Sequence, residues 1–156
     1  LLAATLATSG IATAQTDWPT RPVRLIVPFP PGQAADIFGR VMADELSRRW
    51  PQRAVVENRA GGAGALGMEA VARAAPDGYT LGVGTSGTLG INPSVMTRLP
   101  YDAERDFAAI TNIFTLPLIF VAHPSFEANT MAEFVALARR APNTVQYASA
   151  GPGTAQ

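Results

Sequence analysis

The apolar positions of this chain switch repeatedly between the spacing of buried strands and the spacing of amphipathic helices. Residues 23–27 form a largely apolar run with β-branched side chains, whereas apolar residues within 37–50 recur at intervals of three and four. The pattern predicts strands at 23–27, 54–57, 80–84, 107–113, 118–122 and 145–149, and helices at 37–50, 66–74, 92–98 and 131–138. Alternating strands and helices predict an α/β fold with a parallel sheet and helices on both faces.

Polar residues mark where two of these helices should begin. Asp36 precedes the helix at 37–50 and is a suitable N-cap residue. Thr130 precedes the helix at 131–138, and Glu133 follows it three residues later, as in a capping box. The second signal is more specific, because two side chains must match at a fixed spacing.

Three glycine-containing loops follow predicted strands, at 28–36, 85–92 and 149–154. In open parallel sheets, ligands bind outside the carboxyl ends of the strands. The last two loops carry the hydroxyls of Ser86, Thr88, Ser149 and Thr154. Backbone N–H groups and hydroxyls together indicate an anion site built from neutral donors. Ordinary turn chemistry explains the same loops equally well, since every α/β domain has them.

The composition narrows the classes of function. Of the 156 residues, 47% are hydrophobic and 15% are charged, which argues against disorder. Twelve basic and twelve acidic side chains balance, so no basic excess points to nucleic acid or to an anionic membrane surface. The absence of cysteine excludes disulfides and thiolate metal sites, and His123 alone cannot form a histidine cluster. We therefore expect no metal and no cofactor.

The first fourteen residues are typical of a targeting segment. They are apolar and small, too few to span a membrane, and end in Ala12-Thr13-Ala14, an A-x-A cleavage pattern that places the mature start at Gln15. An exported chain without cysteine is expected in the periplasm. The alternative is a disordered tail on a cytosolic protein.

Two motifs suggest other functions but match poorly. Residues 62–67 fit the dinucleotide fingerprint G-x-G-x-x-G, but they do not directly follow a strand and no acidic residue follows the next strand. Residues 84–88 resemble a nucleophile elbow, except that Thr88 replaces its last glycine. A secreted serine hydrolase using Ser86 and His123 is the leading alternative function. We expect a binding protein and not an enzyme.

An ordered set of short motifs resembles one known family. The opening, residues 22–32, reads Pro-Val-Arg-Leu-Ile-Val-Pro-Phe-Pro-Pro-Gly. Further matches follow at 56–59, 75–81, 84–88, 91–93, 99–102, 106–107 and 147–151. The chain resembles the substrate-binding proteins of tripartite tricarboxylate transporters, also called the Bug family, across residues 18–156.

The resemblance implies a periplasmic type II solute-binding fold, in which two α/β domains close around a cleft. It also implies a protein about twice as long, so that this sequence would be a truncated, N-terminal half. The expected layout is a partial signal peptide at 1–14, an incomplete first domain at 15–121 and the start of a second at 122–156. Such receptors hold carboxylates through backbone amides, hydroxyls and waters, and deliver them to membrane transporter subunits. We expect a monomer that binds a small organic carboxylate.

The resemblance also carries ligand contact onto the three loops. The residues concerned are Pro31, Gly32, Gln33, Ala34, Asp36, Ser86, Gly87, Thr88, Asn92, Ser149, Gly151, Gly153 and Thr154. The first loop departs from the family pattern, since Gln33 replaces a glycine and Ala35 replaces a hydroxyl residue. This departure puts the usual dicarboxylate preference in doubt. Asp36 fits the family pattern, yet it could cap its helix without touching ligand.

Overall fold

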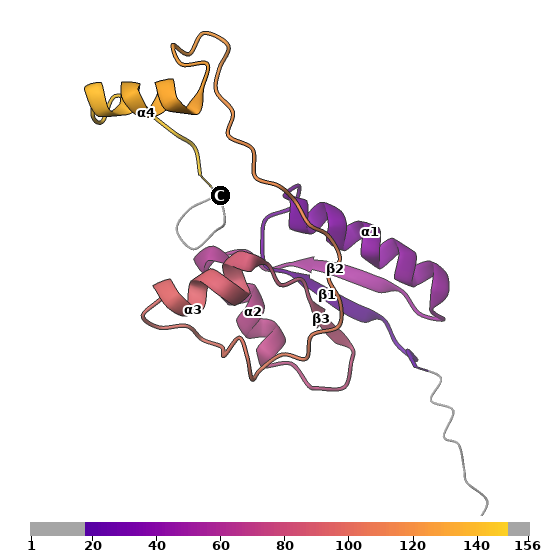
Figure 1. The fold of residues 1–156 in the computed structure, drawn as a ribbon. Helices are drawn as coiled ribbons and strands as arrows, with labels where there is room; N and C mark the ends of the chain where they lie inside the picture. The colour runs from indigo at the N-terminus through magenta and orange to yellow at the C-terminus, as the bar shows by residue number, and fades with distance from the viewer. Residues whose placement is uncertain (1–17, 150–156) are drawn as a thin grey trace, which may run out of the picture.

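A three-stranded parallel sheet forms the centre of the computed structural model, which describes residues 18–149 (Figure 1). Strand β1 (Val23–Val27) lies between β2 (Ala54–Asn58) and β3 (Thr80–Gly82), so the sheet order is β2-β1-β3. In this register Arg24 lies beside Val55 on one side and Thr80 on the other. The predicted α/β fold with a parallel sheet is therefore confirmed.

Helices cover both faces of this sheet, as the largely apolar β1, buried at every position except Arg24, requires. Leu25 and Val27 form one core with Ala35 and Ala43 of α1 (Ala34–Arg49). On the other face, α2 (Ala65–Ala72) lies so close that a Cβ at Gly82 would come within 2.8 Å of Val71. Figure 1 shows the two helices on opposite sides of the strands.

Helix α1 begins three residues earlier than the sequence predicted. Its N-cap is Gln33, whose side chain makes no capping hydrogen bond, and Asp36 lies in the first turn. The Asp36 carboxylate reaches back and accepts the N–H of Gly32, at 2.8 Å. Asp36 thus stabilises the start of the helix from inside its first turn, as the acid of a capping box does, and not from the N-cap position.

The expected loop at 85–92 is largely helical. The segment η2 (Gly87–Ile91) is a π-helical turn that leads directly into α3 (Asn92–Val95). Thr85 and Thr88 start it reciprocally: the Thr85 N–H donates to Thr88 Oγ1 at 2.9 Å, and the Thr88 N–H donates to Thr85 Oγ1 at 3.3 Å. Two threonines at this spacing satisfy backbone donors that a helix start leaves free, so the helical segment begins well before residue 92.

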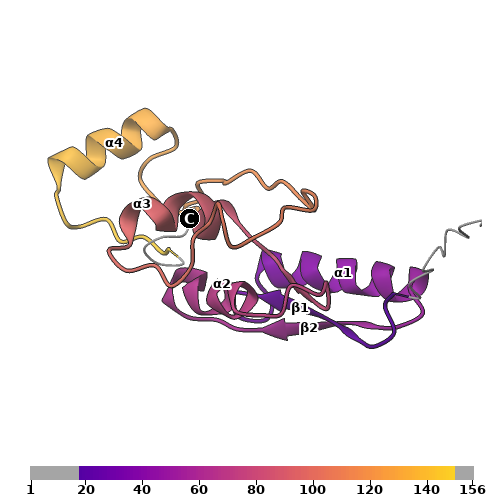
Figure 2. The ribbon, with the colours of Figure 1, turned by 90° about the horizontal axis from the view of Figure 1, so that it is seen from below.

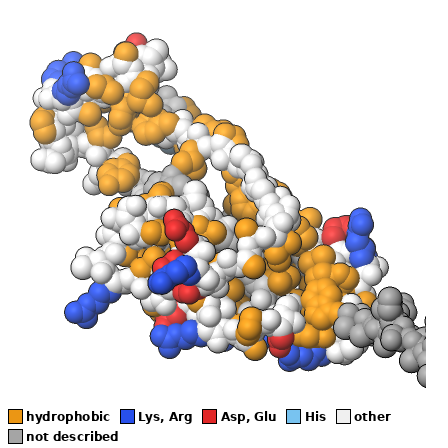
Figure 3. Space-filling view, turned by 60° about the horizontal axis from the view of Figure 1, so that its bottom comes forward, with side chains coloured by type: hydrophobic (Ala, Val, Ile, Leu, Met, Phe, Trp, Pro, Cys, Tyr) orange, Lys and Arg blue, Asp and Glu red, His pale blue; other side chains and the backbone are white. Residues whose placement is uncertain are grey.

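Residues 107–123 run as an extended arm that leads to α4 (Met131–Arg140), which lies apart from β1, β2 and α1 (Figures 1 and 2). No strand occurs between residues 83 and 149, so the predicted strands at 107–113, 118–122 and 145–149 are not formed. A strand requires a paired neighbour, and here these segments have none in the described sheet. The arm exposes apolar side chains (Figure 3), among them Ile119, 76% exposed, and Val121, 79% exposed.

Within residues 18–149, no helix combines the length and the apolar character needed to cross a lipid bilayer.

The predicted capping of α4 by Thr130 is confirmed. Thr130 Oγ1 accepts the Glu133 N–H at 3.2 Å, and Glu133 Oε2 accepts the N–H of Asn129 at 2.7 Å. We expect Thr130→Ala to destabilise α4 by about 1 kcal/mol, the usual contribution of such a cap. Amide hydrogen exchange should then quicken across residues 134–138, whereas Thr130→Ser, which keeps the acceptor, should change little. Equal exchange in both variants would contradict the prediction.

Candidate functional site

The loops that follow β1, β2 and β3 meet at one edge of the sheet, because parallel strands end on the same side. Asn58 Nδ2 donates to the Phe29 carbonyl at 3.0 Å, which ties the second loop to the first. Asn92 Nδ2 donates to the Ala63 carbonyl at 3.0 Å, which ties the second loop to the helical segment after β3. The three loops therefore form one connected structure.

Sequence reasoning identified the first and third of these loops and missed the second. Gly61 and the glycines of η1 (Gly62–Gly64) were predicted to form a loop, but this loop was not counted as a ligand site, and residues 62–67 were weighed only as a nucleotide fingerprint. These glycines, and Ala63 between them, adopt positive φ angles, from 51° at Ala63 to 133° at Gly61. The signal that could have found this loop is its position directly after the second of three parallel strands.

Gly64 shows how closely this second loop approaches its neighbours. A Cβ at Gly64 would lie 2.5 Å from Thr88 Cγ2 and 3.4 Å from the Phe29 ring. Side chains of the first and third loops thus converge on a position where only glycine fits, and glycine also tolerates the φ of 87° found there.

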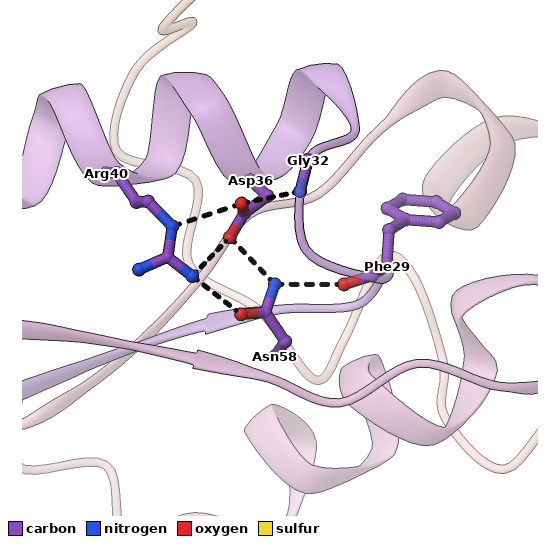
Figure 4. Close-up of polar contacts among 5 residues, drawn as sticks. All are labelled: Phe29, Gly32, Asp36, Arg40 and Asn58. Carbon is purple, nitrogen blue, oxygen red and sulfur yellow. Dashed lines mark hydrogen bonds and ion pairs between the residues drawn. The ribbon is translucent and has the colours of Figure 1, made fainter.

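A buried carboxylate organises the first loop (Figure 4). Asp36, 3% exposed, accepts hydrogen bonds from the Gly32 N–H at 2.8 Å, from Asn58 Nδ2 at 2.9 Å and from Arg40 Nε at 3.1 Å. Arg40 Nη2 lies 2.9 Å from Asp36 Oδ1 and donates to Asn58 Oδ1 at 3.0 Å. Donors of the chain itself therefore occupy both oxygens of Asp36, and they fix Gly32 relative to β2.

These contacts keep Asp36 ionised. The Arg40 hydrogen bond, followed by those of Gly32 and Asn58, lowers the pKa of Asp36 from its ordinary 3.8 to about 2, against an opposing effect of burial. The same carboxylate raises the pKa of Arg40. The positive charge of Arg40 is thus balanced by Asp36.

The structure separates the predicted contact residues into exposed and buried sets. Pro31, Gly32, Gln33 and Ser86 are exposed, and Ala34 is half-buried. Gly87, Thr88 and Asn92 are buried, as is Asp36. Thr88 Oγ1 bonds the backbone of Thr85, and the Asn92 amide bonds that of Ala63. The buried residues hold the loops together, while the exposed ones are available to a ligand.

The remaining predicted contacts lie at the end of the chain. Ser149 is exposed and is the last residue that the structure describes. Gly151, Gly153 and Thr154 lie outside the described residues, as does the predicted targeting segment 1–14.

The serine hydrolase alternative would need Ser86 and His123 to be neighbours. His123 Nδ1 lies 2.8 Å from the hydroxyl of Ser125 and accepts the backbone N–H of Ser125 at 3.2 Å. Both residues belong to the segment that leads to α4, whereas Ser86 starts the helical segment beside the sheet. Among the described residues, the imidazole is therefore engaged locally and not by Ser86.

Comparison with protein families gives one match over most of the chain. A family described as "Tripartite tricarboxylate transporter family receptor" matches residues 38–156. Protein BugT of Bordetella pertussis is 36% identical over 146 residues, which cover 92% of this chain and 45% of the relative. The UPF0065 protein in the tcbD-tcbE intergenic region of Pseudomonas sp. is 34% identical over 154 residues, which cover 98% of this chain and 46% of the relative. The chain thus spans about half the length of the curated relatives it matches.

Solved structures extend the comparison to the fold. The structure described as "R. palustris Rpa4515 with adipate" aligns with a TM-score of 0.70 and 33% identity, over 83% of this chain and 43% of that one. MatC from Rhodopseudomonas palustris with bound malate aligns with a TM-score of 0.56 and 38% identity, over 58% of this chain and 31% of MatC. The periplasmic binding protein BugD aligns with a TM-score of 0.55 and 34% identity, over 58% of this chain and 30% of BugD. The predicted solute-binding fold is confirmed over the aligned part.

Proposed function

The chain belongs to the tripartite tricarboxylate transporter family of receptors, and from this premise we propose that the whole protein captures a small carboxylate-bearing molecule in the periplasm for a membrane transporter. Members of this family are transport receptors and not enzymes, so Ser86 and His123 are assigned no catalytic role. The observation that carries the proposal is the connected edge formed by the loops after three parallel strands.

The chemistry of this edge suits a carboxylate. Gln33 of the first loop and Ser86 of the third are exposed and offer backbone or hydroxyl donors, whereas the Gly32 N–H is already bonded to Asp36. The charge of Arg40 is neutralised by Asp36, so neutral donors would carry the recognition. Two relatives have been solved with adipate and with malate, both dicarboxylates. Their ligands define the chemical class that we propose for this protein.

We further propose the two-domain layout, with residues 15–121 in the first domain and 122–156 beginning the second. The extended arm and the separate position of α4 support a boundary near Ala122 (Figure 2). The ligand would then lie between the loops of the sheet edge and the loop at 149–154, which includes Ser149, Gly151, Gly153 and Thr154. A cleft of this kind buries most of the surface of a small ligand.

Calorimetry and thermal shift with the full chain test the function. We expect adipate or malate to bind and to raise the melting temperature, because a ligand that binds only the folded state stabilises it. The diamine putrescine, of similar length but opposite charge, should have no effect. Binding of putrescine without binding of any mono- or dicarboxylate would overturn the proposal.

Ser86→Ala is expected to weaken carboxylate binding about tenfold, since a hydrogen bond to a charged group contributes about 1.5–3 kcal/mol. Ser94→Ala is the matched control, because Ser94 is also exposed but lies at the far end of the same helical segment. Isothermal calorimetry measures both. Equal affinity of Ser86→Ala and the parent would exclude this hydroxyl from the site.

Export is the last element of the proposal. Cleavage after Ala14 should leave Gln15 as the first residue of the mature protein. Mass spectrometry of protein isolated from the periplasm would reveal this terminus, and a mature protein that retains residues 1–14 would refute the cleavage.

A further inference from the structure

The π-helical turn η2 leaves one backbone carbonyl without a partner in its own helix. Here the Asn92 N–H bonds the Gly87 carbonyl, five residues back, and not the Thr88 carbonyl as in an α-helix. The next N–H along a π-helical ladder would come from residue 93, which is a proline and has none. The Thr88 carbonyl therefore needs a donor from elsewhere.

Tyr101 supplies this donor. Its hydroxyl donates a short hydrogen bond to the Thr88 carbonyl. The tyrosine is 6% exposed, forms a core with Ala65 and Met68 of α2, and meets Phe107 edge to face with ring centroids 5.5 Å apart. The hydroxyl is thus held in place by packing that does not involve η2 itself.

The same hydrogen bond favours the π register over the α register. In an α-helix the Asn92 N–H would take the Thr88 carbonyl, and the Gly87 carbonyl would lose its donor. Such a change removes one residue from the turn and rotates residues 86–88 by about 100° relative to α3, since an α-helix has 3.6 residues per turn. Occupation of the Thr88 carbonyl by Tyr101 stabilises the alternative that is observed.

Asn92 connects this turn to the loop after β2. Its amide donates to the carbonyl of Ala63, whose φ of 51° is unusual for a residue with a side chain. Asn92 Oδ1 is buried and has no hydrogen-bond partner among the described residues. The amide donor of Asn92 is therefore the part that the structure uses, and a change of register at residue 92 would move the Ala63 loop as well.

We propose that Tyr101 is a positioning residue: its hydroxyl fixes the π turn and thereby sets where Ser86 and the Gly61–Gly64 loop meet a ligand. The expected change in ligand affinity rests on the proposed function, whereas the expected change in amide hydrogen exchange across residues 86–92 does not. Tyr101 lies behind the turn, packed on α2 and Phe107, so it acts on the ligand through residues of the turn and not by direct contact.

The test compares two tyrosines that each lose only a hydroxyl. Tyr101→Phe keeps the ring in its core, and the control Tyr79→Phe removes a hydroxyl that accepts the Thr20 N–H at 3.0 Å near the opposite edge of the sheet. We expect Tyr101→Phe to bind adipate about fivefold more weakly and to exchange amide hydrogens faster across residues 86–92. Tyr79→Phe should leave both properties unchanged even where it lowers the melting temperature.

A rescue variant separates positioning from general loss of stability. Pro93→Ala restores an N–H that can reach the Thr88 carbonyl in the π register. In the Tyr101→Phe background it should recover at least about half of the lost binding free energy, since residues that share one partner are coupled. Parental affinity in Tyr101→Phe, or a loss that Pro93→Ala does not reduce, would overturn the proposal.

The two proposals can fail separately. If the parent binds no mono- or dicarboxylate, the proposed function fails, and amide exchange across residues 86–92 alone decides the role of Tyr101. Unchanged exchange in Tyr101→Phe would then refute the positioning role.

Discussion

Replacing Asp36 with alanine is expected to weaken carboxylate binding by about a hundredfold, more than any other polar substitution at this edge. The carboxylate is the shared acceptor for Gly32, Arg40 and Asn58. Without it, the Gly32 N–H loses its partner, and the Arg40 charge that had been balanced faces the ligand edge unpaired. The first loop would then no longer be held in one conformation, and its donors would bind poorly.

Calorimetry with adipate measures this effect, and Asp44→Ala is the matched control. Asp44 lies on the same helix but is exposed, so its loss should leave affinity unchanged. Circular dichroism shows whether the variants keep their helices. An Asp36→Ala protein that binds as tightly as the parent would show that the first loop does not depend on this network.

The Asp36 network also predicts a dependence of stability on acidity. The pKa of Asp36 is about 2 in the folded protein against an ordinary 3.8, so its stabilising contribution is complete above pH 3.8 and is lost as the pH falls toward 2. The difference in melting temperature between the parent and Asp36→Asn should therefore be constant above about pH 5 and shrink between pH 4 and pH 2. A difference that stays constant down to pH 2 would contradict the assigned pKa.

Gly67→Ala is expected to lower the free energy of unfolding by about 3 kcal/mol, at the upper end for overpacked positions. A Cβ at Gly67 would lie 2.6 Å from Pro28 Cα and 2.8 Å from the carbonyl oxygen of Arg59. Both are backbone atoms, which cannot swing aside as a side chain can. Helix α2 would have to move away from the loops after β1 and β2, and the connected edge would open.

Gly90→Ala provides the matched control for this substitution. A Cβ at Gly90 would meet nothing within 4 Å, although this glycine is also helical. Alanine should be neutral there or should stabilise by up to about 1 kcal/mol, because glycine loses more backbone entropy on folding. Urea denaturation of both variants gives the comparison, and similar stabilities for the two would mean that the contact at Gly67 relaxes easily.

The sheet was predictable because its signals are local. The apolar run of β1 and the helical spacing in α1 each lie within one stretch of sequence, and their alternation implies the parallel arrangement. The arm at 107–123 has the same apolar, β-branched character, but pairing depends on a neighbour that no local pattern reveals. The sequence therefore predicted strands there that the structure does not form.

The candidate site was predictable only in outline. Loops after parallel strands must meet at one edge, which identified 28–36 and 85–92. The pairing of Asp36 with Arg40 and Asn58 joins residues from α1 and β2, so it depends on the packing of one element on another. The π turn involves the Thr88 carbonyl, the Tyr101 hydroxyl that bonds it and the following Pro93, which lie far apart in any helical pattern. Helical periodicity alone gives no indication of such a turn.

The sheet order has a consequence for how the protein reaches its fold. The strand that comes first in the chain, β1, is the central one, and both of its partners arrive later through helical crossovers. No hairpin joins neighbouring strands among the described residues, so the first pairing of these strands must close a long loop, which slows folding in proteins of high contact order. We therefore expect substitutions in β1, such as Ile26→Val, to slow refolding, and substitutions in β3 mainly to speed unfolding.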